Sequence, residues 1–185
     1  MAKFTRLQLE GMDLNLFFRI NGVPVHIATF GTSIPQNLND CNRIAENWMS
    51  VKSLPYSTQF QLNGAYLEQT ATNAGYEYLL DERSGYMHDI HNTFPSMDAF
   101  DKNVPLPVKL YSWSFVDMAR RGFYSFAPRE GITEQDGRIR FILISRPIVP
   151  LQHRIDNLPE FQIPNFYIEN NEIETEGIFF FEIIK

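Results

Sequence analysis

The sequence predicts an α+β fold that is mainly β, with an antiparallel sheet or sandwich, an N-terminal β-hairpin and two helices at about 34–52 and 113–121. Most apolar runs have the length of a strand and are either alternating or continuous. Asn-Gly and Asp-Gly pairs, which are strong hairpin signals, stand between several of these runs. Only two stretches carry apolar residues at helical spacing. We expect a single domain over 1–185, because this length is typical of one hydrophobic core.

The clearest local pattern is a β-hairpin on either side of Asn21-Gly22. A type I′ turn at this pair would place Phe18 opposite Val25. Because side chains alternate between the faces of a strand, six apolar residues would then share one face. These residues are Leu16, Phe18, Ile20, Val23, Val25 and Ile27.

The two predicted helices are recognised by their caps and by their apolar spacing. At the helix of about 34–52, Ser33 can act as the N-cap. Its buried face would consist of Leu38, Cys41, Ile44, Ala45, Trp48 and Val51. At the helix of about 113–121, Ser112 or Ser114 can cap the first turn.

The rest of the chain is predicted to consist of strands and long connections. Asn63-Gly64 is a second hairpin signal, so Tyr66–Thr72 is expected to pair back on the strand before it. Arg140–Ile144 is a nearly unbroken apolar run, which predicts a central strand covered on both faces. We expect an irregular segment at 86–107 and a connector at 147–164, which contains four prolines.

Composition and charge exclude several classes of function. The chain has 16 Lys and Arg against 22 Asp and Glu, and a net charge of −6 does not favour general nucleic-acid binding. Cys41 is the single cysteine, which excludes an intramolecular disulfide and argues against a cysteine-built zinc site. There is no apolar signal segment at the N-terminus and no run near the about 20 apolar residues of a membrane span. We expect a location in the cytoplasm or within an assembled particle, and no cofactor.

The densest group of metal-capable residues is His88, Asp89 and His91. On a helix, residues three apart share a face, so the two imidazoles could bind one ion, and Asp81, Glu82 or Asp98 could add an oxygen ligand. The neighbouring Gly85 and Pro95 favour a loop instead, where spacing fixes no geometry. A metal site here is therefore an alternative hypothesis.

Aromatic residues are unusually frequent, with 16 Phe, 8 Tyr and 2 Trp, and many lie within 111–126 beside arginines. Part of them must fill the core, but surplus rings next to arginine are typical of interface anchors. We predict a protein interface formed by this stretch and by the irregular segment before it. Its residues are Trp113, Phe115, Arg120, Arg121, Tyr124, Phe126, Phe94 and Phe100.

The absence of familiar catalytic motifs and the aromatic surplus favour a non-enzymatic structural or interaction protein. We expect it to bind other protein subunits, as a homo- or hetero-oligomer, in a larger assembly such as a virion, a phage tail or a secretion apparatus. One alternative is a small metal-dependent hydrolase that uses His88 and His91. Another is an acidic inhibitor or immunity-type protein, in which the segment 169–176 with its four glutamates would bind a basic partner.

Overall fold

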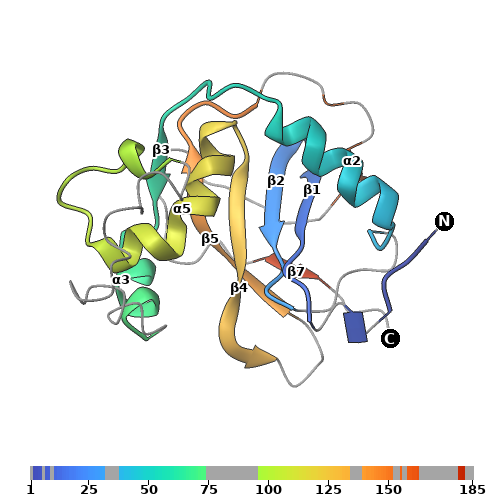
Figure 1. Cartoon of the computed structure of the whole chain (residues 1–185), viewed down its shortest axis with the longest axis horizontal. Coiled ribbons are helices and arrows are strands. Elements are labelled where there is room, and N and C mark those ends of the chain that lie inside the picture. The colour runs from blue at the N-terminus through green and yellow to red at the C-terminus, as the bar shows by residue number, and fades with distance from the viewer. Residues whose placement is uncertain are drawn as a thin grey trace, which may run out of the picture.

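The chain forms an α+β fold in which helices cover a mixed β-sheet, as a computed structural model shows (Figure 1). The structure describes residues 2–5, 7–8, 11–31, 38–73, 96–133, 139–151, 155, 158–162 and 179–181. The strands are β1 (Asn15–Ile20), β2 (Val23–Ala28), β3 (Phe60–Leu62), β4 (Tyr124–Thr133), β5 (Ile139–Pro147), β6 (Glu160–Phe161) and β7 (Phe179–Phe181). The helices are α2 (Cys41–Lys52), α3 (Gly64–Asn73), the 3-10 turn η4 (Met97–Ala99) and α5 (Leu106–Arg120).

The sheet has the strand order β3-β5-β4-β2-β1-β6, and β7 pairs with β5. The predicted antiparallel sheet or sandwich is therefore wrong in part, because β2 pairs in parallel with β4 and β1 pairs in parallel with β6. Parallel neighbours need a long crossover connection, and α2, α3 and α5 all lie in the connection from β2 to β4. The predicted central strand is confirmed as β5, which lies between β3 and β4.

The first two strands form a hairpin with the predicted register. Phe18 is opposite Val25, and Ile20 is opposite Val23. Asn21 and Gly22 have φ values of 49° and 81°, and a type I′ turn requires positive φ at both positions.

Alternating residues of the sheet supply two apolar layers. Phe141 and Leu143 of β5 pack with Leu16 and Phe18 of the hairpin on one face. Ile142 and Ile144 point to the other face, where they pack against α3 and α5. Figure 1 shows α2 and α5 on the same side of the sheet, and Val51 and Met118 from these helices pack together on Phe17 of β1. Burial of these side chains is the main force that holds the helices on the sheet.

Both predicted helices exist, but each begins at a different residue from the one expected. α2 begins at Cys41 rather than near residue 34, because the Asp40 side chain accepts hydrogen bonds from the amides of Asn42 and Arg43. Residues 32–37, which include the predicted cap Ser33, lie outside the described residues.

α5 begins at Leu106 rather than at residue 113. Pro105 and Pro107 stand at its start, where a missing N–H breaks no helical bond. Ser112 is interior instead of a cap, and its hydroxyl donates to the Val108 carbonyl at 2.6 Å. The described part of the segment expected to be irregular, 96–107, thus contains η4 and the first residues of α5.

The predicted strand Tyr66–Thr72 is wrong, because these residues belong to helix α3. Asn63 lies between the last residue of β3 and the first residue of α3. Its amide donates to the Ile144 carbonyl, its side chain donates to the Leu143 carbonyl, and its own carbonyl accepts from the Leu67 amide, each at 3.0 Å. A residue that bonds to the neighbouring strand and to the next helical turn directs the chain into a helix, not into a hairpin.

Candidate functional site

A pocket of about 670 Å³ lies between β3 and the loop that leads to α5. We name it the Phe60 pocket, and its lining includes Phe60, Leu62, Ala99, Phe100, Val104 and Arg120. The rings of Phe60 and Phe100 meet edge to face at 5.6 Å between centroids. Thr58, Gln59 and Asp101 complete the lining, so the pocket combines apolar and polar walls. A pocket of this size and mixed character has the dimensions of a binding site for a small molecule or for a short segment of another protein.

A buried ion cluster lies at the adjoining ends of α2 and α5. We name it the Asp117 cluster, and it consists of Asp117, Lys52, Tyr56, Ser96 and Arg121. The Asp117 residue is 1 % exposed. One of its carboxylate oxygens is 3.1 Å from Lys52 Nζ and 3.6 Å from Arg121 Nε. The other accepts from the Tyr56 hydroxyl and, at 3.4 Å, from the Ser96 hydroxyl.

Burial by itself raises the pKa of Asp117, but its partners outweigh that effect. The hydrogen bond from Tyr56 and the charges of Arg121 and Lys52 hold the pKa of this carboxyl below its usual value of 3.8. Asp117 is therefore ionised at neutral pH. Its negative charge holds the C-terminal ends of the two helices together.

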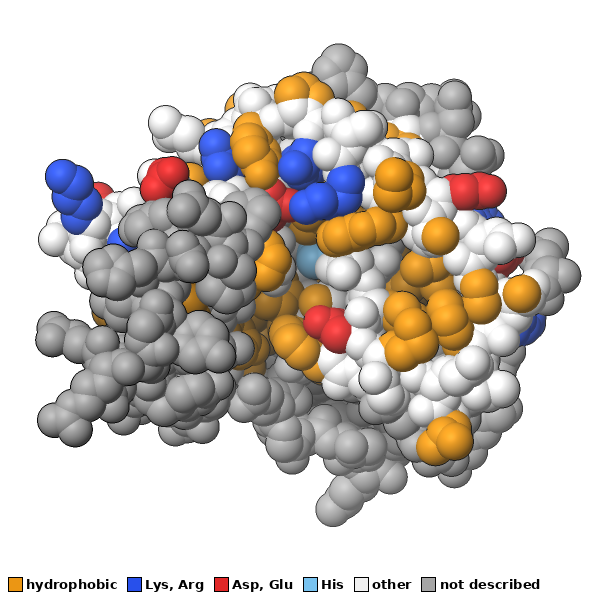
Figure 2. All heavy atoms as spheres, in the orientation of Figure 1, with side chains coloured by type: hydrophobic (Ala, Val, Ile, Leu, Met, Phe, Trp, Pro, Cys, Tyr) orange, Lys and Arg blue, Asp and Glu red, His pale blue; other side chains and the backbone are white. Residues whose placement is uncertain are grey.

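Arg120 connects the Asp117 cluster to the Phe60 pocket. One of its Nη atoms donates to Ser96 Oγ at 3.0 Å, and its guanidinium lies 3.9 Å from the centroid of the Tyr56 ring. The same side chain lines the pocket. Among the residues that the structure describes here, the three cations Lys52, Arg120 and Arg121 surround the carboxylate of Asp117, so the summed charge of these four side chains is positive. Figure 2 shows Lys and Arg side chains gathered on this face near an acidic one.

The sequence places these charges at a helix end for identifiable reasons. Asp117, Arg120 and Arg121 are three and four residues apart, so they lie on neighbouring positions around the last turn of α5. Cations near a helix C-terminus are also stabilised by the helix dipole. The chain then turns at Gly122, whose φ is +97° and whose Cα would place a Cβ 2.6 Å from the Leu151 amide nitrogen. Only glycine fits this turn without strain.

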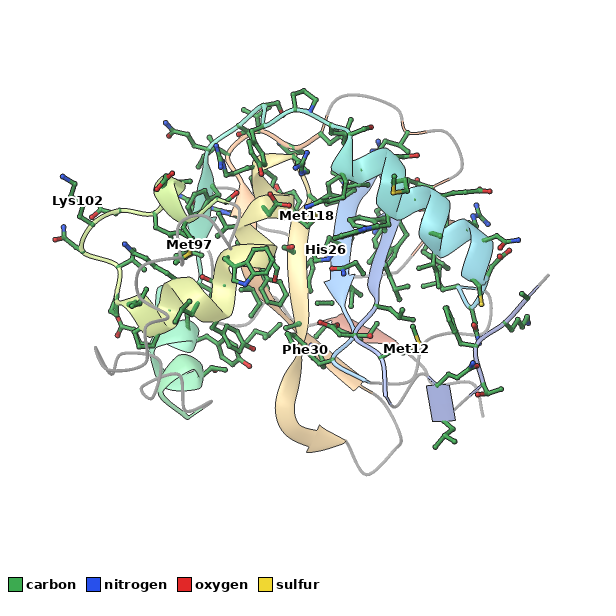
Figure 3. The ribbon with its side chains drawn as sticks, in the orientation of Figure 1. Met12, His26, Phe30, Met97, Lys102 and Met118 are labelled. Atoms are coloured by element: carbon green, nitrogen blue, oxygen red, sulfur yellow. The ribbon has the colours of Figure 1, made fainter. Side chains whose placement is uncertain are left out.

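A second polar group is buried in the sheet at His26. Its Nε2–H donates to Asn15 Oδ1 at 2.7 Å, and its Nδ1 is 2.5 Å from Ser125 Oγ and accepts the hydroxyl proton of that serine. Its ring stacks on Phe17 at 5.1 Å between centroids. Figure 3 labels His26, which belongs to β2 and lies beside β4.

Burial lowers the pKa of His26 to about 3, although the charge of Asp117 partly opposes this shift. The imidazole is therefore neutral at physiological pH. A serine that donates to a histidine is the pair that nucleophilic catalysis uses. Here His26 and Ser125 are both 0 % exposed, so no substrate reaches them in this conformation. Their bonds instead join β1, β2 and β4 across the sheet.

The structure brings three of the predicted interface residues together. Phe100 and Arg120 line the Phe60 pocket, and the half-buried Trp113 packs in the same apolar cluster as Phe60 and Phe100. Phe100 lies on the loop before α5, and Trp113 and Arg120 lie on α5 itself. Phe60, which was not among the predicted interface residues, joins them from β3, a distant part of the sequence.

The other predicted interface residues lie elsewhere. Phe115 and Phe126 are 0 % and 1 % exposed in the core, which leaves no surface of these side chains for a partner. Arg121 belongs to the Asp117 cluster and is 7 % exposed. Tyr124 is half-buried at the start of β4, where burial raises its pKa and the charge of Arg146 partly offsets the effect. Phe94 lies outside the described residues, and the interface itself stays a prediction.

The residues of the alternative metal site, His88, Asp89 and His91, also lie outside the described residues, as does the acidic segment 169–176. In the described ranges, no group of three or more His, Cys, Asp or Glu side chains is arranged to hold a metal ion. The described helices include none with the length and apolar character that a membrane crossing requires.

Sequence reasoning missed Lys52, Tyr56 and Phe60 as members of the site. Asp117 was a usable signal, because an acidic residue within the apolar stretch of a helix needs a partner when it is buried. The sequence alone did not show which cations would reach it.

No protein family matches this sequence, and the comparisons with curated proteins and with solved structures also give no match. The pocket and the charges beside it are therefore the features from which function is inferred. Together they can hold an apolar group against aromatic walls and an anionic group against Arg120.

Proposed function

We propose that this chain is a non-enzymatic interaction protein, a subunit of a larger assembly such as a virion, a phage tail or a secretion apparatus. It binds a neighbouring protein subunit through the Phe60 pocket. The observation that carries the proposal is the pocket itself, with its apolar walls and a single guanidinium beside a positive cluster. Aromatic and arginine side chains in such a place are the residues that dominate binding energy at protein interfaces.

The buried state of His26 and Ser125 supports an interaction role over a catalytic one. In the described part of the chain, these two residues form the arrangement that most resembles a catalytic pair. Both are fully buried, so water does not reach them. Arg120, in contrast, is half-buried and lines a pocket large enough for a partner's side chains.

The proposal is tested by filling the pocket. Ala99 lines it, so Ala99→Gln would place a longer side chain in the space without removing a core residue. The matched control is Asn103→Gln, which puts the same side chain at an exposed position of the loop.

The measurement is the mass of the complex purified from the native source, determined by light scattering. The wild type and Asn103→Gln are expected in particles well above the 21.6 kDa of one chain, and Ala99→Gln is expected as the single chain. A wild-type protein that is a monomer in its native source would overturn the proposal.

A further inference from the structure

The outer edge of β3 has backbone groups that pair with no described strand, and it lies beside the Phe60 pocket. Gln59 and Asn63 both bond to β5, through the Ile148 amide and the Ile144 carbonyl. In an antiparallel ladder the bonded residues alternate with residues whose N–H and C=O point away from the partner strand. The alternate residues here are Phe60 and Leu62.

Within the described residues, β3 is the last strand on its side of the path β3-β5-β4-β2-β1-β6. Phe60 and Leu62 therefore direct two amides and two carbonyls outward, and no described strand receives them. The register supports this assignment, because Pro147, which has no N–H to give, is the residue opposite Phe60. Exposed edges of this kind are templates for an added strand.

The side chains of the same two residues form walls of the Phe60 pocket. An extended segment that paired with this edge would thus have its backbone at β3. Its alternate side chains would reach Phe60, Leu62 and Phe100, because side chains on one face of a strand recur every second residue.

The charges at one end of the edge determine which segment fits best. The Ser57 and Thr58 amides both donate to the Arg120 carbonyl, at 3.0 and 3.3 Å, so the end of β3 nearest residue 58 is fixed beside Arg120. That end carries the positive excess of Lys52, Arg120 and Arg121. The other charged lining residue, Asp101, is exposed on the loop before α5 and accepts from the Asn103 amide of its own turn at 2.8 Å. It keeps its negative charge, which solvent screens at this exposed position.

We propose that the Phe60 pocket and the outer edge of β3 bind one extended segment of a partner protein as an added strand. The segment carries apolar residues at alternate positions and a carboxylate that pairs with Arg120. This inference rests on the proposed interaction function and names the chemistry of the partner. Main-chain bonds to Phe60 and Leu62 supply affinity, and the pocket and Arg120 supply selectivity.

The experiment uses short peptides of alternating valine and threonine as probes. One peptide ends in aspartate, a second ends in asparagine, and a third is the aspartate peptide with N-methyl groups on alternate backbone amides. Binding to the full chain is measured by fluorescence anisotropy.

The aspartate peptide is expected to bind up to about fivefold more tightly than the asparagine peptide, since the ion pair is partly exposed. N-methylation is expected to weaken binding by about tenfold, because it removes main-chain hydrogen bonds. Arg120→Gln should abolish the preference for aspartate. Lys102→Gln, which removes a cation from an exposed loop position, should retain it (Figure 3).

Equal affinity for the methylated and unmethylated peptides would overturn the added strand. Equal affinity of the wild type for aspartate and asparagine would overturn the role of Arg120. A dimer of this chain that buries the β3 edge would also overturn the inference. If no peptide binds while Ala99→Gln still dissociates the native complex, the inference fails and the proposed function stands. The two peptide comparisons need no protein variant, so the folding of Arg120→Gln does not limit them.

Discussion

Asp117→Asn tests whether the Asp117 cluster stabilises the packing of α2 against α5. The substitution keeps the shape of the side chain and removes its charge. It leaves Lys52 and Arg121 without the carboxylate that lies 3.1 and 3.6 Å from them. The asparagine oxygen can still accept from the Tyr56 hydroxyl, so one hydrogen bond of the cluster is retained.

The magnitude follows from which charge stays buried. Removing one partner of a buried ion pair costs about 3–5 kcal/mol, because the other charge is left in a poorly solvated place. The Lys52 side chain is 33 % exposed and can be hydrated again, whereas that of Arg121 is only 9 % exposed. We therefore expect a loss at the lower end, about 3 kcal/mol of unfolding free energy. For a chain of this length the melting temperature should fall by about 6–12 °C.

The effect should also depend on pH. Burial raises the pKa of Asp117, but Tyr56, Arg121 and Lys52 together hold it below the usual 3.8 in the folded state. A carboxyl whose folded pKa is depressed stabilises the protein above its unfolded pKa, and this contribution is lost as the pH falls through the folded value. The difference between wild type and Asp117→Asn should therefore be largest at neutral pH and should shrink below about pH 4.

Urea unfolding followed by tryptophan fluorescence measures this difference from pH 7 downward. Glu46→Gln is the control, because it removes a carboxylate from an exposed position of α2 and should change stability by less than about 0.5 kcal/mol. A loss for Asp117→Asn as small as that of the control at pH 7 would refute the reasoning.

Two further substitutions test the sheet and the turn after α5. Burial lowers the pKa of His26 to about 3, against an ordinary value of 6.5. Between these two pH values the unfolded chain binds a proton that the folded protein does not. The unfolding free energy of the wild type should therefore decrease by about 1.4 kcal/mol for each unit by which the pH is lowered in this range. His26→Gln should flatten this slope in urea unfolding curves, and an unchanged slope would contradict the assignment. Gly122→Ala should cost about 3 kcal/mol, because it combines a positive φ with a Cβ placed 2.6 Å from the Leu151 nitrogen. Gly22→Ala, also at positive φ but with open space around it, should cost only about 1 kcal/mol, and equal thermal shifts for the two variants would show that the Leu151 contact is unimportant.

Local signals in the sequence predicted the hairpin well. Asn21-Gly22 favours a type I′ turn, and that turn alone determines which residues of β1 and β2 are opposite each other. The same reasoning failed at Asn63-Gly64, because there the Asn63 side chain bonds to β5 and the chain continues as α3. Whether an Asn-Gly pair forms a hairpin or starts a helix can thus depend on a strand that follows 80 residues later. A local sequence pattern does not contain that information.

The parallel pairing of β2 with β4 could not be predicted from local patterns either, because it joins Val25 to Tyr124 across α2, α3 and α5.

The placement of the aromatic residues was difficult to predict for a related reason. Phe115 and Trp113 are two positions apart on α5, so they face different directions, and only the packing shows that Phe115 is in the core while Trp113 lies near the pocket. The composition indicated that some aromatic rings would cluster near the surface, but it did not determine which rings would lie there and which would lie in the core.

Amide hydrogen exchange at Phe60 and Leu62, measured by NMR in the isolated chain and in the complex from the native source, tests the central claim most directly. The account predicts that both amides exchange much more slowly in the complex, because the partner's strand receives their N–H groups. The exposed Lys102 amide should exchange at the same rate in both samples. Unchanged exchange at Phe60 and Leu62 in a complex of confirmed mass would contradict the account.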